Sequence, residues 1–259
     1  MRTEEEMVAY ALEIEPELLP FIPELLQDLE ELGSDSDIII ELLEDLDVPE
    51  AARVVDLGCG KGAVSIAIAE ELGFEVLGID LFEPFIESCK SAAQEEGVDE
   101  LCTFKHADII KLAGTLGTFD IAIFAALGDT LAPLQETIGI IRQFVKPGGY
   151  IVISDDYLKE GGSAYYPGFE DCVPYAETIA RLQAHGDVVI DEIIEFESED
   201  QAHEEDLDEN AAIRRRAEEL AGLHPELADA FLNFADGQQE ETDFIEENLV
   251  PVTWLLQRT

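Results

Sequence analysis

The sequence predicts an α/β protein built on a seven-stranded, mostly parallel sheet with helices on both faces. Between residues 52 and 156, strand-like apolar runs alternate with helix-like runs, as in parallel strands joined by helical crossovers. The runs at residues 54–57 and 121–127 are apolar on both sides, which is typical of a sheet covered on both faces. At 259 residues the chain is long enough for one such domain and an additional cap.

Seven segments carry the strand pattern. The expected strands are residues 53–57, 74–80, 102–108, 119–127, 148–155, 187–196 and 250–258. Apolar residues at helical spacing fill the intervals, and the sequence Pro-Gly-Gly at residues 147–149 ends one of these helices. We therefore expect the sheet to extend to the end of the sequence.

Residues 1–50 are expected to form an N-terminal helical cap, and residues 51–259 the main domain. Thr3 and Ser36 are candidate helix caps within the first segment, and Pro23 suits the first turn of a helix that ends at Gly33. These helices are candidates for a lid, with a covering layer at the sheet's edge as the structural alternative.

A helical insertion is expected around residues 200–247 of the main domain, as two or three short helices. The acidic run at residues 197–210 reads as an exposed connection leading into it.

The chain is strongly acidic. Sixty acidic residues against fourteen basic ones give a net charge of −46. Such a charge repels nucleic-acid phosphates and anionic membranes, so we expect neither partner. The longest apolar run is too short to span a membrane and the N-terminus is acidic, so a cytoplasmic protein is expected. The four cysteines show no metal-ligand spacing, so we expect buried thiols and no metal.

One glycine-rich segment carries the functional signal. Residues 54–62 read VVDLGCGKG, in which a strand meets three glycines before a helix. Gly58, Gly60 and Ala63 satisfy the dinucleotide pattern G-x-G-x-x-G/A, and Asp80 is an acid about 20 residues further on. The glycines alone therefore leave the choice of adenosine-bearing cofactor open.

Asp56 separates these cofactors. A carboxylate beside a doubly charged pyrophosphate costs energy, whereas beside an ammonium group it is favourable. S-adenosylmethionine has no phosphate and carries an ammonium and a sulfonium cation. Asp80 can accept hydrogen bonds from both ribose hydroxyls, and the glycines let the backbone approach the methionine part. These residues favour S-adenosylmethionine.

The sequence resembles the class I S-adenosylmethionine-dependent methyltransferases in five segments. In the family's order and spacing, they are VVDLGCGKG (54–62), VLGIDL (76–81), HADI (106–109), FDIAIFAAL (119–127) and FVKPGGYIVIS (144–154). The resemblance implies a Rossmann-like fold with an antiparallel last strand, and methyl transfer to a small-molecule acceptor by in-line displacement. The C-terminal part is similar to the ubiquinone and nodulation-factor methyltransferase-like branch.

The resemblance also implies cofactor-binding roles. Asp56, Gly58 and Gly60 would line the methionine end, and Asp80 would bind the ribose. The remaining roles fall on Leu81 and Ile109 beside the adenine, Asp108 at its amino group, and Ala125 near the sulfonium. Structural alternatives stay open: Asp56 and Asp80 as cap or turn residues, Asp108 as a strand end, and Gly62 as a packing residue.

Acceptor-binding residues are expected after the fourth and fifth strands, because the carboxyl ends of parallel strands meet at one edge. The candidate catalytic residues are Asp129, Asp156 and Tyr157, and the loop with Tyr165 and Tyr166 is a candidate pocket wall. A general base is needed only if the nucleophile starts protonated. Asp129 as a helix cap is the structural alternative.

Two other functions stay open at this point. A nicotinamide-dependent oxidoreductase could use the same glycines, although the sequence has no recognisable catalytic Tyr-x-x-x-Lys motif. A protein that binds S-adenosylmethionine without catalysis would also carry this loop. The acceptor's identity and the oligomeric state are left open as well.

Overall fold

The computed structural model describes the backbone of residues 2–195 and 199–259, and their side chains except those of residues 129 and 199–208. The chain divides into two compact units. The first comprises Met1–Glu30 and Phe196–Val250, and the second Glu31–Glu195 and Pro251–Thr259. The domain boundary expected at residue 50 therefore falls inside the second unit.

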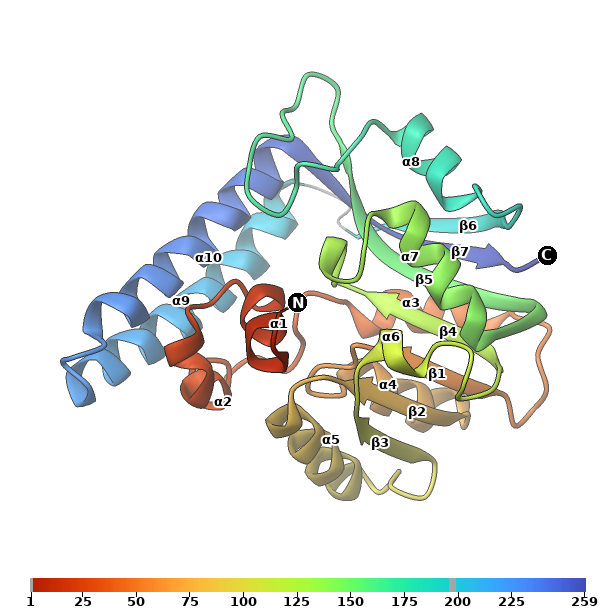
Figure 1. The fold of residues 1–259 in the computed structure, drawn as a ribbon, viewed down its shortest axis with the longest axis horizontal. Helices are drawn as coiled ribbons and strands as arrows, with labels where there is room; N and C mark the ends of the chain where they lie inside the picture. Colours follow the sequence, from red (N-terminus) through yellow and green to blue (C-terminus); the bar gives the residue numbers. More distant parts are fainter. Residues whose placement is uncertain (1, 196–198) are drawn as a thin grey trace. The chain divides into compact units, whose positions relative to one another are not determined.

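The second unit holds a seven-stranded sheet in the order β3-β2-β1-β4-β5-β7-β6 (Figure 1). Its strands are β1 (Arg53–Leu57), β2 (Glu75–Asp80), β3 (Cys102–His106), β4 (Phe119–Ala125), β5 (Val145–Leu158), β6 (Val188–Ile194) and β7 (Leu249–Gln257). β1 to β5 pair in parallel, whereas β7 is antiparallel to β6. The predicted fold, including its antiparallel last strand, is confirmed.

Helices surround this sheet. They are α3 (Ser36–Glu44), α4 (Ala63–Ala67), α5 (Glu83–Glu96), α6 (Ile109–Leu112), α7 (Leu134–Ile141) and α8 (Tyr175–Leu182). α4 continues as one π-helical turn, Ile68–Leu72. Ile39 and Leu43 of α3 share a buried cluster with Val54, Ile123 and Val152 of the strands, so α3 belongs to the core of the sheet unit. The amphipathic pattern of residues 36–44 therefore serves to cover the sheet.

The described residues of the first unit are mainly helical. It contains α1 (Glu4–Ala11), a 3₁₀ segment (Pro16–Phe21), α2 (Ile22–Leu25), α9 (Glu199–Leu223) and α10 (Ala228–Asn248). α9 and α10 form an antiparallel pair (Figure 1), and the Phe21 ring packs edge-on against Phe231 of α10 at 5.1 Å. Asp28 accepts hydrogen bonds from Arg215 and Arg216 at 2.7 Å, so the basic cluster of α9 forms ion pairs. No described helix in either unit combines the length and the apolar composition of a membrane span.

Four local expectations need correction. The helix expected to end at Gly33 stops at Leu25, and the acidic run is helical from Glu199 onward. In place of the short helices expected over residues 207–247, the structure has the two long helices α9 and α10. Their apolar residues pack the two helices against each other. Asp35 rather than Ser36 caps α3, because its carboxylate accepts from the N–H groups of Asp37 and Ile38. Thr3 caps α1 as expected, through a reciprocal pair of hydrogen bonds with Glu6.

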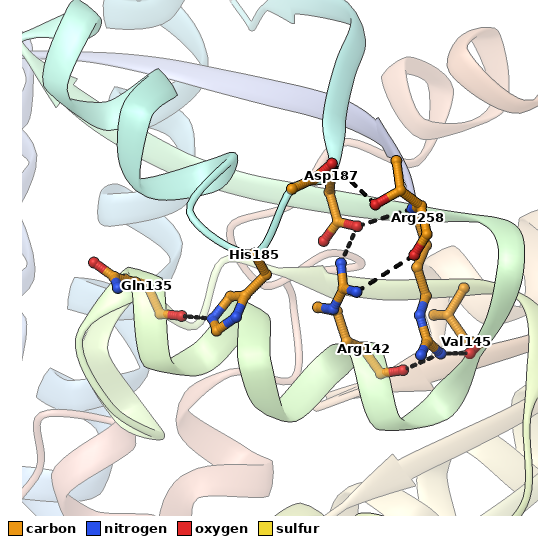
Figure 2. A network of polar contacts seen from close by, with 8 residues as sticks. Gln135, Arg142, Val145, His185, Asp187 and Arg258 are labelled. Atoms are coloured by element: carbon orange, nitrogen blue, oxygen red, sulfur yellow. Dashed lines mark hydrogen bonds and ion pairs between the residues drawn. The ribbon is translucent and has the colours of Figure 1, made fainter.

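A polar network joins α7 to the last residues of the chain (Figure 2). Arg142, at the end of α7, forms an ion pair with Asp187, whose side chain is fully buried. Asp187 also accepts from the N–H of Thr259 at 3.1 Å, and Arg258 donates to the carbonyls of Arg142 and Val145. The network therefore ties β7 and the start of β6 to the helix before β5.

Arg142→Ala should lower the free energy of unfolding by about 3 kcal/mol, because it leaves the Asp187 carboxylate buried without its cation. The measurement is urea unfolding. Lys90→Ala, which removes an exposed partner of Glu87, is the control and should change stability by at most about 0.5 kcal/mol. Equal effects of the two substitutions would show that burial of Asp187 contributes nothing.

Candidate functional site

The glycine-rich loop connects the end of β1 to α4. Gly58, Gly60 and Gly62 all have positive φ angles, of 83°, 49° and 93°. A Cβ at Gly58 would lie 2.1 Å from Cδ1 of Leu127, and one at Gly62 would lie 2.9 Å from Sγ of Cys89 in α5. Gly62 thus lets α5 approach the loop, whereas Gly58 meets the loop after β4. Both positions require glycine on steric grounds.

The N–H groups of this loop are directed into the protein. Gly58 and Cys59 both donate to the carbonyl of Ile79, at 2.7 and 3.0 Å. The N–H of Gly60 donates to Oδ2 of Asp80 at 3.0 Å, and that of Gly62 to the carbonyl of Cys59 at 2.8 Å. Phosphate-binding loops present such N–H groups to their ligand. This loop uses them to hold its own shape.

Asp56 is a buried carboxylate next to the loop. It is 4% exposed, and its Oδ2 accepts a hydrogen bond from Oγ of Ser65 in α4 at 2.6 Å. Burial raises the pKa of Asp56 to about 6; the bond from Ser65 opposes this shift and the nearby Asp80 adds to it. Its described contact is with a side chain of the helix rather than with the helix's first N–H groups. The site therefore holds a carboxylate that a cation would stabilise in its charged form.

Asp80 ends β2 and faces the same loop. Besides accepting from Gly60, it accepts through Oδ1 from the N–H of Phe82 at 2.7 Å. Burial raises the pKa of Asp80, while hydrogen bonds from the backbone N–H groups of Phe82, Gly60 and Leu81 lower it. β2 lies beside β1, with Asp56 in register with Gly78, so the two carboxylates stand on neighbouring strand ends.

Asp108 has a structural role in this structure. It caps α6 by accepting from the N–H groups of Ile110 and Lys111 at 2.9 and 3.4 Å, and its Oδ2 lies 3.1 Å from Nζ of Lys111. Ile109 is buried beside it. The interaction of Asp108 with an adenine stays a prediction.

The remaining predicted residues lie along the carboxyl edge of the sheet. Leu81 and Ala125 are half-buried, and Ala125 is in register with Ser154. Asp156 and Tyr157 belong to the last residues of β5, which continues to Leu158, beyond the end expected at residue 155.

The candidate acceptor-binding residues differ in their surroundings. The Tyr157 ring packs edge-on against Tyr175 of α8 at 5.2 Å, and the Tyr175 hydroxyl donates to Glu192 at 2.9 Å. Asp129 has its backbone in a 3₁₀ turn, Gly128–Thr130, and its side chain lies outside the described residues. The Tyr165 side chain is 94% exposed, so it forms no pocket wall here.

Sequence reasoning missed one buried polar cluster at the carboxyl edge. Glu195 accepts from Oγ of Ser154 at 2.5 Å and from Oγ1 of Thr253 at 3.0 Å. Burial raises the pKa of the Glu195 carboxyl, which the two hydroxyls partly offset. These residues are far apart in sequence, so only the pairing of β5, β7 and β6 brings them together. No local pattern could have identified the cluster.

Comparison with known proteins agrees with this geometry. Residues 49–163 match a family model described as a methyltransferase domain. A SAM-dependent methyltransferase from Geobacter sulfurreducens, solved with S-adenosyl-L-homocysteine, superposes with a TM-score of 0.75 at 20% identity over 93% of this chain and 98% of that one. Residues 49–163 are thus similar to a methyltransferase domain, and the solved structure has the same fold.

Two curated relatives are similar to the same region. The putative methyltransferase YqeM of Bacillus subtilis is 34% identical over 111 residues, which are 40% of this chain and 42% of that protein. Phosphoethanolamine N-methyltransferase 1 of Triticum aestivum is 33% identical over 128 residues, 48% of this chain and 24% of that one. The matched region thus spans less than half the length of either relative.

The raised pKa of Asp56 makes a stability prediction. Because the folded chain holds this proton more tightly than the unfolded chain, the stabilising effect is complete below about pH 4 and is lost as the pH rises through about 6. Asp56→Asn, which can still accept from Ser65, removes this loss. Relative to the unmodified chain, the variant should gain about 3 kcal/mol of unfolding free energy between pH 4 and pH 8. Urea unfolding at several pH values measures the difference in unfolding free energy between the variant and the unmodified chain. A difference that does not change with pH would contradict the raised pKa of Asp56.

Proposed function

We propose that this chain is an S-adenosylmethionine-dependent methyltransferase that acts on a small-molecule acceptor. The observation that carries the proposal is the chemistry of the glycine loop. It presents the buried carboxylate of Asp56 and the half-buried carboxylate of Asp80, while the N–H groups of Gly58, Cys59, Gly60 and Gly62 are bonded within the protein. Such a loop favours a cationic adenosyl ligand over a pyrophosphate.

The described residues fit this cofactor. Asp56 would bind the ammonium group, and Asp80 would accept from the ribose hydroxyls. Gly58 and Gly60 would border the methionine part, and Leu81, Asp108, Ile109 and Ala125 are proposed to border the adenine and the sulfonium. When bound, S-adenosylmethionine supplies an electrophilic methyl group on a good leaving group.

The protein's contribution to such a reaction is positional. Displacement at a methyl carbon requires the acceptor atom in line with the leaving group and water kept away. The ends of β4 and β5 lie side by side, with Ala125 in register with Ser154, so residues after both strands can orient an acceptor. Asp129, Asp156 and Tyr157 remain the proposed candidates for this role.

Support for a small-molecule acceptor comes from two sources. The wheat relative is named for phosphoethanolamine, and the net charge of −46 disfavours nucleic acid as an acceptor. The same charge disfavours an anionic membrane surface. The ubiquinone and nodulation-factor branch, the cytoplasmic location and the lid role of residues 1–50 belong to the same proposal.

The nicotinamide reading is disfavoured by the loop itself. A dinucleotide's pyrophosphate would need N–H donors that this loop has already used, and it would lie beside Asp56. A protein that binds S-adenosylmethionine without catalysis would share the loop. An assay of methyl transfer to a panel of acceptors distinguishes such a binding protein from a methyltransferase.

Calorimetric titration with S-adenosylmethionine, S-adenosylhomocysteine and NADH tests the cofactor. Both adenosyl ligands should bind and NADH should not, and Asp80→Ala should weaken adenosyl binding at least tenfold, which is about 1.4 kcal/mol. Asp99→Ala removes the same charge from an exposed position before β3 and should leave binding unchanged. Binding of NADH without either adenosyl ligand would refute the proposal.

The pH dependence of binding tests the role of Asp56. An ammonium group binds the ionised carboxylate, so S-adenosylhomocysteine should bind about tenfold more weakly at pH 5 than at pH 7.5, given a pKa of about 6. 5′-Methylthioadenosine lacks the ammonium group and should show a smaller change. Asp56→Asn should bind S-adenosylhomocysteine weakly at both pH values. A pH effect of the same size on both ligands would exclude Asp56 as its origin.

A further inference from the structure

Two loops that are distant in sequence meet the glycine loop. Leu127 follows β4 and Leu32 precedes α3, and each contacts one of the loop glycines. A Cβ at Gly58 would lie 2.1 Å from Cδ1 of Leu127, and one at Gly60 would lie 3.4 Å from Cδ1 of Leu32. Leu127 therefore occupies the space that a side chain at Gly58 would need, whereas Leu32 lies at van der Waals distance from the position of a Cβ at Gly60. We call Leu32 and Leu127 the leucine pair.

The turn that carries Leu127 is strained. Ala126 has a φ of 52°, a left-handed conformation that costs an L-residue about 1 kcal/mol or more. Its methyl carbon lies 3.2 Å from the position that a Cβ would take at Gly33, the residue after Leu32. The two leucine-bearing loops thus also touch each other. Strain of this kind persists only where surrounding contacts impose it, and here the turn places Leu127 on Gly58.

The two ends of the glycine loop are held by different interactions. A hydrogen bond from the Gly60 N–H to Asp80 holds the end near the ribose-binding carboxylate. Gly58 follows Asp56 by two residues; its N–H donates to the carbonyl of Ile79, and the side chain that fills the space beside its Cα is that of Leu127. Removing Leu127 should therefore disturb the end nearest Asp56 and leave Asp80 in place.

We propose that the leucine pair consists of positioning residues that shape the methionine-binding part of the cofactor site through Gly58 and Gly60. The inference rests on the proposed function and extends it, because Leu32 lies outside the matched methyltransferase domain at residues 49–163. The segment before α3 then contributes to cofactor affinity. Ligands that lack the amino acid part do not depend on the pair.

The test compares two ligands that differ by that part. S-adenosylhomocysteine and 5′-methylthioadenosine share the adenosine thioether, and only the first carries the amino acid group. Leu127→Ala should weaken S-adenosylhomocysteine binding about tenfold and leave 5′-methylthioadenosine binding within about twofold. Leu32→Ala, whose contact is looser, should act in the same direction with a smaller loss. Leu101→Ala, at another half-buried leucine, is the control and should change neither affinity.

A double substitution tests the contact directly. Gly58→Ala forces a methyl group into Leu127 and also strains the backbone at a positive φ, so it should weaken binding of S-adenosylhomocysteine more than tenfold. Adding Leu127→Ala frees the space but leaves the backbone strain, so Gly58→Ala should cost less affinity in Leu127→Ala than in the unmodified chain. Leu127→Met keeps an apolar side chain of similar volume and should bind almost as the unmodified chain does. Thermal unfolding of each variant measures its folded fraction.

Several results would overturn the inference. Equal loss of both ligands in Leu127→Ala and Leu32→Ala would make the pair a support of the fold alone, and unchanged binding in both would remove its role. An equal loss of affinity from Gly58→Ala in the unmodified chain and in Leu127→Ala would exclude the steric link to Gly58, because backbone strain alone acts equally in both. If the unmodified chain bound 5′-methylthioadenosine and S-adenosylhomocysteine with equal affinity, no methionine subsite would exist. Failure to bind either ligand would instead refute the proposed function itself.

Discussion

The closure of the glycine loop against β2 is the constraint on which the rest of the site depends. Within residues 58–62 the chain must leave a buried strand, reverse and begin a helix, and buried N–H groups need partners throughout. The carbonyl of Ile79 accepts two of them, and the side chain of Asp80 accepts a third. This closure places Asp56 under the loop and brings Gly58 and Gly60 against leucines from two other loops. A ligand then meets carboxylates rather than N–H donors.

Burying Asp56 beside that loop opposes stability and favours binding. Its carboxylate keeps a described hydrogen bond to Ser65, and Asp80 adds a second negative charge nearby. A bound ammonium group would relieve both the desolvation and the repulsion, because an opposite charge favours the ionised form. The free-energy cost of burying this carboxylate without a cation therefore becomes part of the affinity for a cationic ligand. Residues whose pKa values are shifted by burial often mark functional sites for this reason.

Local patterns in the sequence predicted the fold and identified the residues of the candidate cofactor site. Alternating strand and helix patterns located all seven strands, and the segment around Asp56, Gly58 and Gly60 was identified because strand, turn and helix signals follow one another. Helix ends were less predictable: the Asp35 carboxylate caps α3, and the Ser36 hydroxyl donates to Glu31. Helices were expected over residues 207–247, but the lengths of α9 and α10 were underestimated, since the two long helices pair with each other.

Contacts between distant segments could not be predicted in the same way. Leu32, Leu127 and Ser65 are ordinary residues in ordinary local sequences. Their roles arise because parallel strands deliver their loops to one edge of the sheet, where a glycine has room for a neighbour's side chain. A motif search finds the glycines and the acids of such a site, whereas the residues that fill the glycines' space require the fold.

The charges of the sheet unit follow the direction of its strands. At the amino edge the acids have basic partners: Asp120 accepts from Lys146 at 2.8 Å, and Asp187 pairs with Arg142. The carboxyl edge ends in acids on β1, β2 and β6, namely Asp56, Asp80 and Glu195, and burial raises the pKa of each. In their ionised forms these groups would attract a cation that approaches the edge and would repel an anion. In the proposed reaction, transfer of a methyl group from a sulfonium removes a positive charge from the ligand, so the same electrostatic field would favour the reactant over its product. The direction that parallel strands impose on the sheet would thus influence both the binding of the ligand and the release of the product.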